Sequence, residues 1–156
     1  MNTPKTEQKL NAILEKTYDA QKGYANAAEN ATDENDPNLA RWFAHQGQRR
    51  TEYAAAIIGE MKNMNLEPEL ESSVKGDVHR GWLNFKLNFT SDEEEAILEE
   101  CLRGEKAAIE EYEDVLNNSG ELPPTIVSVL RTQKDEIHAT VSKIKRLEDL
   151  ENYQNI

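Results

Sequence analysis

The chain has 156 residues, with 18 basic and 30 acidic side chains, so its formal net charge is -12 at pH 7. This length suffices for one domain with a real hydrophobic core, and the negative field disfavours binding to nucleic acid or anionic lipid. No apolar run reaches the roughly 18–20 residues that span a bilayer, and the N-terminus lacks the apolar segment of an export signal. We therefore expect a soluble cytoplasmic protein that binds neither nucleic acid nor a membrane.

Two helices are predicted in the first part of the chain. Apolar residues recur at helical spacing through 6–31, and the polar run from Thr32 to Pro37 ends that pattern. Asp36 can cap a second helix with Pro37 in its first turn, and the helical period continues through 37–64. Because few residues join these helices, we expect them to form an antiparallel hairpin.

The connection that follows, 66–92, is longer and contains a helical pattern of its own at 77–89. The apolar face of that pattern carries three aromatic residues, Trp82, Phe85 and Phe89. Such a face offers a surface for packing against another copy of the chain. The segment is either a crossover along a helical bundle or an extension of the next helix, and the sequence leaves both open.

The second part of the chain repeats the helical hairpin pattern. A capping box of Ser91 and Glu94 starts a long third helix, 93–116. Pro124 lies in the first turn of a fourth helix, whose apolar stripe continues to Leu147. The short connection between these two helices again predicts an antiparallel pair.

Four long amphipathic helices with no strand pattern predict an all-α protein, an antiparallel four-helix bundle with a short extra helical segment before the third long helix. We expect residues 1–156 to form a single domain, with an ordered core of about 6–150.

A carboxylate, Glu105, interrupts the apolar stripe of the third helix. Burying a lone carboxylate is costly, so Glu105 must meet a cation, a proton or a metal ion. The other three stripes also have polar interruptions near mid-length, at Gln21, Gln46, Arg49, Arg50, Gln133 and Lys134. The simpler interpretation is a structural polar layer, in which an arginine or lysine pairs with Glu105 and the glutamines cap it.

The alternative is a metal site. A carboxylate-bridged di-metal centre in a four-helix bundle needs a Glu from each of two helices and a Glu-x-x-His from each of the other two. The sequence contains no Glu-x-x-His; Asp135-x-x-His138 resembles half of such a site opposite Glu105, and Glu52 has no histidine three residues later. The candidate metal ligands are therefore Glu105, Asp135, His138 and Glu52, for iron or another divalent ion.

No other site chemistry has a recognisable pattern. The glycines are scattered and form no phosphate-binding loop. The single cysteine, Cys101, lies on an apolar stripe, where a buried and inert thiol is expected. We nominate no catalytic residue, no cofactor-binding residue and, outside the metal alternative, no cofactor.

Short motifs along most of the chain resemble one known family in their order and spacing. They are Asp19, Gly23-Tyr24, Ala27-Ala28-Glu29, the helix from Trp42 to Ile57, Val78-His79-Arg80-Gly81-Trp82, Ile97-Leu98, Cys101, Gly104-Glu105-Lys106-Ala107-Ala108, Tyr112, Leu122-Pro123-Pro124 and Gln133. Over about residues 8–150 they are similar to a bacterial family of small ferritin-like four-helix-bundle proteins, catalogued as a domain of unknown function. The resemblance implies the ferritin-like fold, with an inserted helical segment before the third helix, but no activity, substrate or ligand set.

The family pattern often has a histidine on the last helix where this chain has Val141, and His138 lies one turn earlier. This departure from the family pattern weakens the argument that the chain inherits a metal site from the family. We therefore expect a non-catalytic structural or interaction module, which binds an unknown protein partner or associates with itself. Analogy with the ferritin-like superfamily extends this expectation to a role in stress. The alternative is a metal-binding bundle of a degenerate di-iron type.

Overall fold

The computed structural model describes residues 3–33, 37–70, 91–120 and 122–151. Within these ranges the chain forms four long helices and a short 3-10 helix, with no strand: α1 Thr3–Asp33, α2 Pro37–Asn63, α4 Ser91–Asn117, α5 Pro124–Lys143 and η2 Leu147–Leu150. The all-α prediction is confirmed, and the first three long helices lie within a few residues of their predicted bounds. No helix in these ranges is long and apolar enough to cross a membrane.

The residues at the two ends of α2 explain where this helix begins and where it ends. Pro37 is its first residue, where a missing backbone N–H costs nothing. At its C-terminus Asn65 adopts a left-handed conformation, with φ 59°. The N–H of Leu66 then donates to the carbonyl of Met61 at 2.9 Å, and the N–H of Asn65 to that of Lys62 at 3.0 Å. These two bonds satisfy carbonyls that the end of a helix leaves without partners.

The fourth helix is shorter than predicted, because α5 ends at Lys143 and not near Leu147. Ile144 is extended, with φ -109° and ψ 108°. The Asp149 carboxylate accepts hydrogen bonds from the freed backbone N–H groups of Lys145 at 2.8 Å and Arg146 at 3.1 Å. Ile144 remains buried although it lies outside the helix. The apolar spacing therefore continues past the point where the helix stops.

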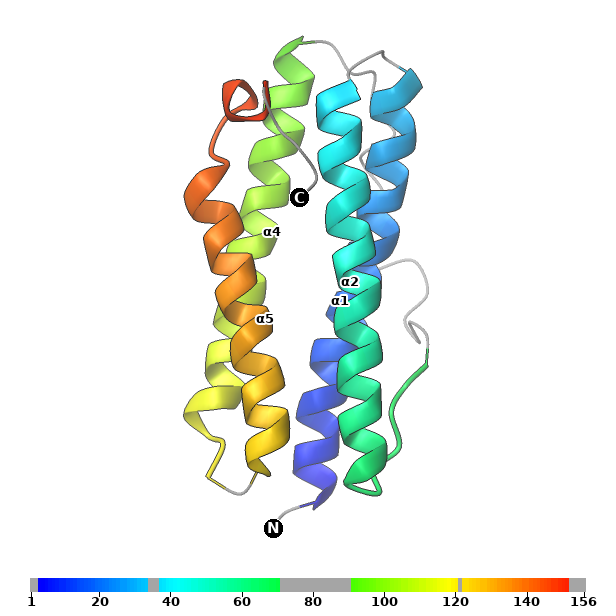
Figure 1. Ribbon diagram of the computed structural model, residues 1–156, viewed down its shortest axis with the longest axis vertical. Coiled ribbons are helices and arrows are strands. Elements are labelled where there is room, and N and C mark those ends of the chain that lie inside the picture. The colour runs from blue at the N-terminus through cyan, green and yellow to red at the C-terminus, as the bar shows by residue number, and fades with distance from the viewer. Residues whose placement is uncertain (1–2, 34–36, 71–90, 121, 152–156) are drawn as a thin grey trace.

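The helices form two antiparallel hairpins, α1 with α2 and α4 with α5 (Figure 1). In Figure 1, α2 and α4 run in the same direction, so α4 begins at the opposite end of the bundle from the end of α2. This arrangement of the described helices is the one that a crossover connection produces. The amphipathic pattern predicted at 77–89 lies outside the described residues, as does the side chain of Ser91 in the predicted capping box.

The start of this connection is attached to α1. The backbone carbonyl of Glu67 accepts a hydrogen bond from Asn11 Nδ2 at 3.1 Å, and the backbone N–H of Glu69 donates to Asn11 Oδ1 at 2.9 Å. The Tyr18 hydroxyl donates to the carbonyl of Glu69. The described part of the connection therefore follows α1 away from the end of α2.

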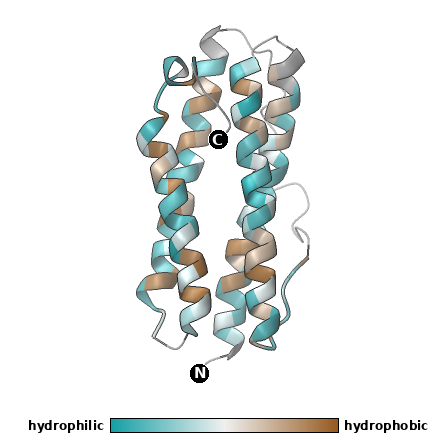
Figure 2. Cartoon of the chain, viewed as in Figure 1, coloured by the Kyte–Doolittle hydropathy of each residue, from teal (hydrophilic) through white to brown (hydrophobic). Residues whose placement is uncertain are grey.

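The hydrophobic core has two parts. One contains Tyr24, Trp42 and Phe43 together with the first half of α4. The other packs the beginning of α1 and the end of α2 against α4 and α5. Figure 2 shows hydrophobic turns in both halves of the bundle, with hydrophilic turns on the same helices. Buried polar residues lie between the two parts, and they form the candidate site.

Candidate functional site

A buried ion pair joins α2 to α4 inside the bundle. The side chain of Arg50 is 3% exposed and that of Glu105 is 1% exposed. Arg50 Nη2 donates a hydrogen bond to Glu105 Oε1. The predicted pairing of Glu105 with an arginine is confirmed, and the partner is Arg50.

Burial and charge act on this pair in opposite directions. Burial raises the pKa of Glu105, whereas the positive charge of Arg50 and a hydrogen bond from Tyr24 act to lower it. Burial also acts to lower the pKa of Arg50, but the Glu105 charge opposes this and the Arg50 pKa is raised. Because arginine stays protonated in proteins, a neutral Glu105 would leave a bare buried cation. The ionised form of Glu105 is therefore the one that compensates the charge of Arg50.

Three tyrosines surround the ion pair. The ring centroids of Tyr53 and Tyr24 lie 5.4 Å and 6.0 Å from the guanidinium carbon of Arg50, which is cation–π distance. The Tyr112 hydroxyl donates to Gln133 Oε1 at 2.6 Å, and Gln133 Nε2 donates to the backbone carbonyl of Tyr53 at 3.2 Å. These contacts connect α2, α4 and α5 around the Arg50 head group.

A second polar group lies at the rim of the bundle, between α2 and α5. Arg49 donates to the Tyr53 hydroxyl at 2.8 Å and to Thr140 Oγ1 at 3.0 Å, and it pairs with Glu136 at 3.3 Å. Tyr53 also donates to Glu136 Oε1 at 2.7 Å. The sequence prediction placed Arg49 and Arg50 together on the inward face. It missed Glu136 and Thr140, although their one-turn spacing on the fourth helix was a usable signal.

The predicted polar layer is partly confirmed. Gln46 and Gln133 are buried, as expected. Gln21 and Lys134 are only partly buried and lie at the edge of the layer. Lys134 points toward its neighbour Asp135, with Nζ 3.9 Å from the carboxylate oxygen.

The candidate metal ligands do not come together in the structure. Glu105 contacts Arg50, whereas Asp135, His138 and Glu52 are exposed. The reason is helical phase: α5 buries Ile126, Leu130, Gln133, Ile137 and Thr140, so Asp135 and His138 fall on its outer face. Among the described residues no group of three or more His, Cys, Asp or Glu side chains could hold a metal ion. The placement of Asp135 and His138 opposite Glu105 is wrong; metal binding itself stays a prediction.

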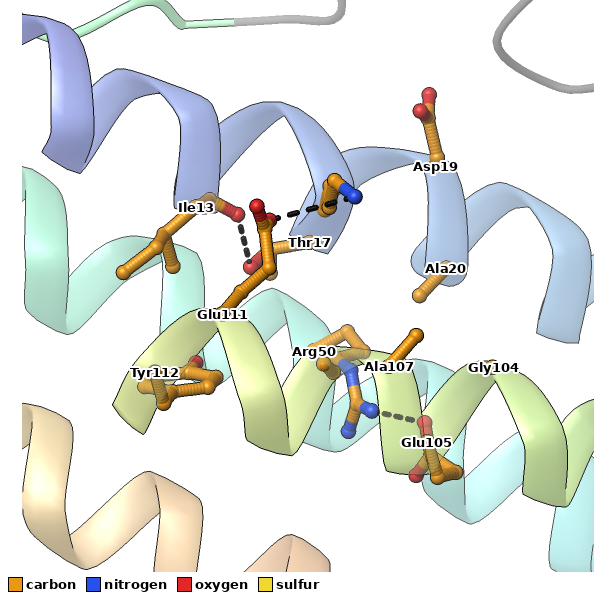
Figure 3. A pocket seen from close by; sticks show the side chains of 12 residues that line it. Ile13, Thr17, Asp19, Ala20, Arg50, Gly104, Glu105, Ala107, Glu111 and Tyr112 are labelled. Carbon is orange, nitrogen blue, oxygen red and sulfur yellow. Dashed lines mark hydrogen bonds and ion pairs between the residues drawn. The ribbon is translucent and has the colours of Figure 1, made fainter. Parts of the chain in front are cut away.

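A cavity of about 210 Å³ lies between α1 and α4, and Arg50 and Glu105 are among the residues that line it. Small side chains on the two facing helices leave this space: Ala20, Gly104, Ala107 and Ala108. Figure 3 shows Arg50 reaching from α2 to Glu105 on α4, with Ala107 beside them. Lys16 and Glu111 form an ion pair between α1 and α4 at 3.4 Å, with the Lys16 side chain 58% exposed. The cavity therefore reaches from the outer surface toward the buried ion pair.

The comparisons with known proteins agree with this architecture. Residues 5–118 match the model of a family described as a domain of unknown function, DUF2383. The chain belongs to this family. A search of curated proteins finds no match for this DUF2383 protein.

Among solved structures, the DUF2383 chain is similar to variants of the ferritin PmFTN. One variant, soaked in iron overnight, has a TM-score of 0.66 at 13% identity and covers 89% of this chain and 88% of its own. Another, soaked in iron for 45 min, has a TM-score of 0.66 at 12% identity, with 96% and 99% covered. At this identity the likeness shows the fold alone, and it confirms a ferritin-like four-helix bundle.

Proposed function

We propose that this DUF2383 protein is a non-catalytic interaction module that acts through its outer surface. The observation that supports this role is the ion pair of Arg50 with Glu105. An inward carboxylate is the usual starting point for metal or acid–base chemistry in a bundle. Here its charge is already neutralised by a side chain of the same protein. A rigid bundle with this interior is suited to holding its exposed helical faces in a fixed arrangement for a partner.

The PmFTN structures were soaked in iron, which raises the question of whether this interior fits iron. The donors do not fit a di-metal centre. Glu105 is engaged by Arg50, and the nearby buried polar residues Gln46 and Gln133 supply neutral amides. Burial raises the pKa of Cys101 well above its ordinary value, so the thiol stays protonated and is a poor ligand. Of the predicted ligands, this leaves the exposed Asp135, His138 and Glu52 for a metal-binding role.

Elemental analysis tests the metal alternative. The protein is purified without chelator, incubated with Fe²⁺, desalted and assayed for bound metal. We expect no stoichiometric metal. His138→Ala is the matched variant, because it removes the exposed imidazole and leaves the core unchanged. Stoichiometric metal that is lost in His138→Ala, or in Glu105→Gln, would replace the interaction role by a metal-binding one.

The partner in this proposal is a second copy of the chain or another protein. Two copies that each carry a charge of -12 repel one another, and salt screens this repulsion. Self-association should therefore increase with ionic strength, whereas binding to a basic partner should decrease. Light scattering at low and high salt, on the wild type and Trp82→Ala, tests the case of self-association. A monomer mass under all conditions would remove self-association. Trp82 lies outside the described residues and is chosen from the sequence pattern.

A further inference from the structure

We propose that the side chains around the Arg50 head group form a binding site for a planar organic cation of the guanidinium class, which Arg50 fills from within the same chain. The site consists of the Glu105 carboxylate and the rings of Tyr24 and Tyr53. When Arg50 is truncated, the same site should take up a free guanidinium ion. This inference concerns the bundle interior and is independent of the interaction role of the surface.

The Glu105 carboxylate and the rings of Tyr24 and Tyr53 form the walls of the proposed site. Their chemistry favours an organic cation over a metal ion. The guanidinium of Arg50 meets one carboxylate, and two aromatic rings lie 5.4 Å and 6.0 Å from its central carbon. Aromatic faces attract weakly hydrated cations. Divalent metal ions need several oxygen, nitrogen or sulfur ligands at fixed geometry and lose water reluctantly. The walls therefore match a flat, weakly hydrated cation that donates an N–H group to the carboxylate.

The two aromatic walls are held in place by contacts that do not involve Arg50. The Tyr53 hydroxyl is fixed by Glu136 at 2.7 Å and Arg49 at 2.8 Å, and its backbone carbonyl accepts from Gln133 at 3.2 Å. The ring of Tyr24 packs edge-on against Trp42, with centroids 5.8 Å apart and an interplanar angle of 84°. Truncation of Arg50 should therefore leave a preorganised site.

A free ion also has a route to this site. The cavity of about 210 Å³ between α1 and α4 is lined by Arg50 and Glu105 themselves (Figure 3). The ion pair of Lys16 with Glu111 is at its surface end, and the Lys16 side chain is largely exposed, so it can move aside. A small cation can thus enter without unfolding of the bundle.

The test is chemical rescue of Arg50→Ala. The midpoint of thermal unfolding is measured in millimolar guanidinium chloride, far below denaturing concentrations, and in equal concentrations of sodium chloride and of magnesium chloride. We expect the midpoint of Arg50→Ala to rise with guanidinium alone, since a ligand that binds only the folded state stabilises it. The wild type, whose site is filled, should not respond. If Arg50→Ala is unfolded without the ligand, the same titration should restore helical circular dichroism.

Further variants test the role of each wall. The double variant Arg50→Ala/Glu105→Ala should lose the response to guanidinium, because the carboxylate is absent. Arg50→Ala/Tyr53→Phe should retain the response, whereas Arg50→Ala/Tyr53→Leu should weaken it several-fold, because leucine removes the ring. The absence of any gain in midpoint or helicity for Arg50→Ala would overturn the proposal. An equal or larger gain with magnesium would overturn its specificity.

Arg50→Lys is a second variant that keeps a positive charge but lacks the planar fork. We expect it to fold with a lower unfolding midpoint than the wild type. A midpoint equal to that of the wild type would show that the site does not distinguish a planar guanidinium from an ammonium group.

Discussion

Arg49 and Arg50 are neighbours in the sequence, yet they lie in opposite environments. The side chain of Arg49 is 18% exposed, and its partner Glu136 is 48% exposed. Arg50 and Glu105 are 3% and 1% exposed. The side chains of consecutive helical residues point about 100° apart. Arg49 therefore lies at the rim of the bundle, whereas Arg50 lies in its interior. The difference teaches that Arg50, which is almost fully buried, depends on its partner more than Arg49, which solvent partly reaches.

The largest effect should come from breaking the interior pair on one side. Glu105→Gln leaves the guanidinium of Arg50 buried without a counter-charge, and we expect it to lower the free energy of unfolding by about 3–5 kcal/mol. The denaturant midpoint measures this loss. A neutral or stabilising effect would mean that Glu105 does not carry the compensating charge.

Removing both members of the interior pair should cost far less than removing one. In Arg50→Met/Glu105→Leu, apolar side chains of similar volume replace the ion pair. We expect a free energy of unfolding within about 1–2 kcal/mol of the wild type, and in either direction. A double-mutant cycle with the two single variants gives the coupling energy. If the losses in free energy of unfolding of the two single variants simply add up in the double variant, Arg50 and Glu105 are not energetically coupled, and the account is contradicted.

The hydrogen bond of Tyr112 sharpens the comparison, because it is buried but uncharged. Tyr112→Phe keeps the ring and leaves Gln133 Oε1 without its donor at 2.6 Å. Leaving a buried acceptor unsatisfied costs about 1–3 kcal/mol. Chemical denaturation should therefore show a loss in free energy of unfolding that is smaller than that of Glu105→Gln and larger than that of a variant of the Arg49–Glu136 pair. A loss as large as that of Glu105→Gln would contradict this ranking.

The rim pair should respond weakly. Glu136→Gln removes one charge from the contact with Arg49 but retains a hydrogen-bonding group of the same size. Because water reaches this side chain, we expect a loss of no more than about 1 kcal/mol, which decreases further in high salt. A loss that matches the interior variants, or one that is insensitive to salt, would show that the rim is not solvated as the exposures indicate.

The smallest effect is local and depends on pH. Hydrogen bonds from the backbone N–H groups of Lys145 and Arg146 lower the pKa of the Asp149 carboxyl. A lowered pKa in the folded state gives stabilisation that is present above the ordinary Asp value and is lost as pH falls through the folded-state value. NMR titration should find the Asp149 midpoint below the ordinary Asp value. A midpoint at the ordinary value would remove this cap from the account of how α5 ends.

The sequence predicts the helices and the inward position of Glu105 well, because both depend on apolar periodicity. The sequence does not decide whether Arg49 or Arg50 is the partner of Glu105, because an apolar stripe locates the inner face of a helix only to within about one residue. For the same reason it placed Asp135 and His138 opposite Glu105, when Gln133 and Ile137 are the buried positions of that turn.

The aromatic walls of the site were beyond reach of sequence reasoning for a different reason. Tyr24 and Tyr53 have the spacing of ordinary core residues on two different helices. Only the packing of those helices against one another brings the rings around the guanidinium of Arg50. The end of α5 was missed because Ile144 stays buried after the helix has stopped.

The most direct test of the central claim, that a guanidinium of the same chain neutralises Glu105, is a crystal structure of protein incubated with Fe²⁺, measured at the iron absorption edge. We expect continuous density that joins the Arg50 guanidinium to Glu105 and no anomalous peak beside that carboxylate. An anomalous peak between Glu105 and a second protein ligand, with Arg50 turned away, would contradict the account.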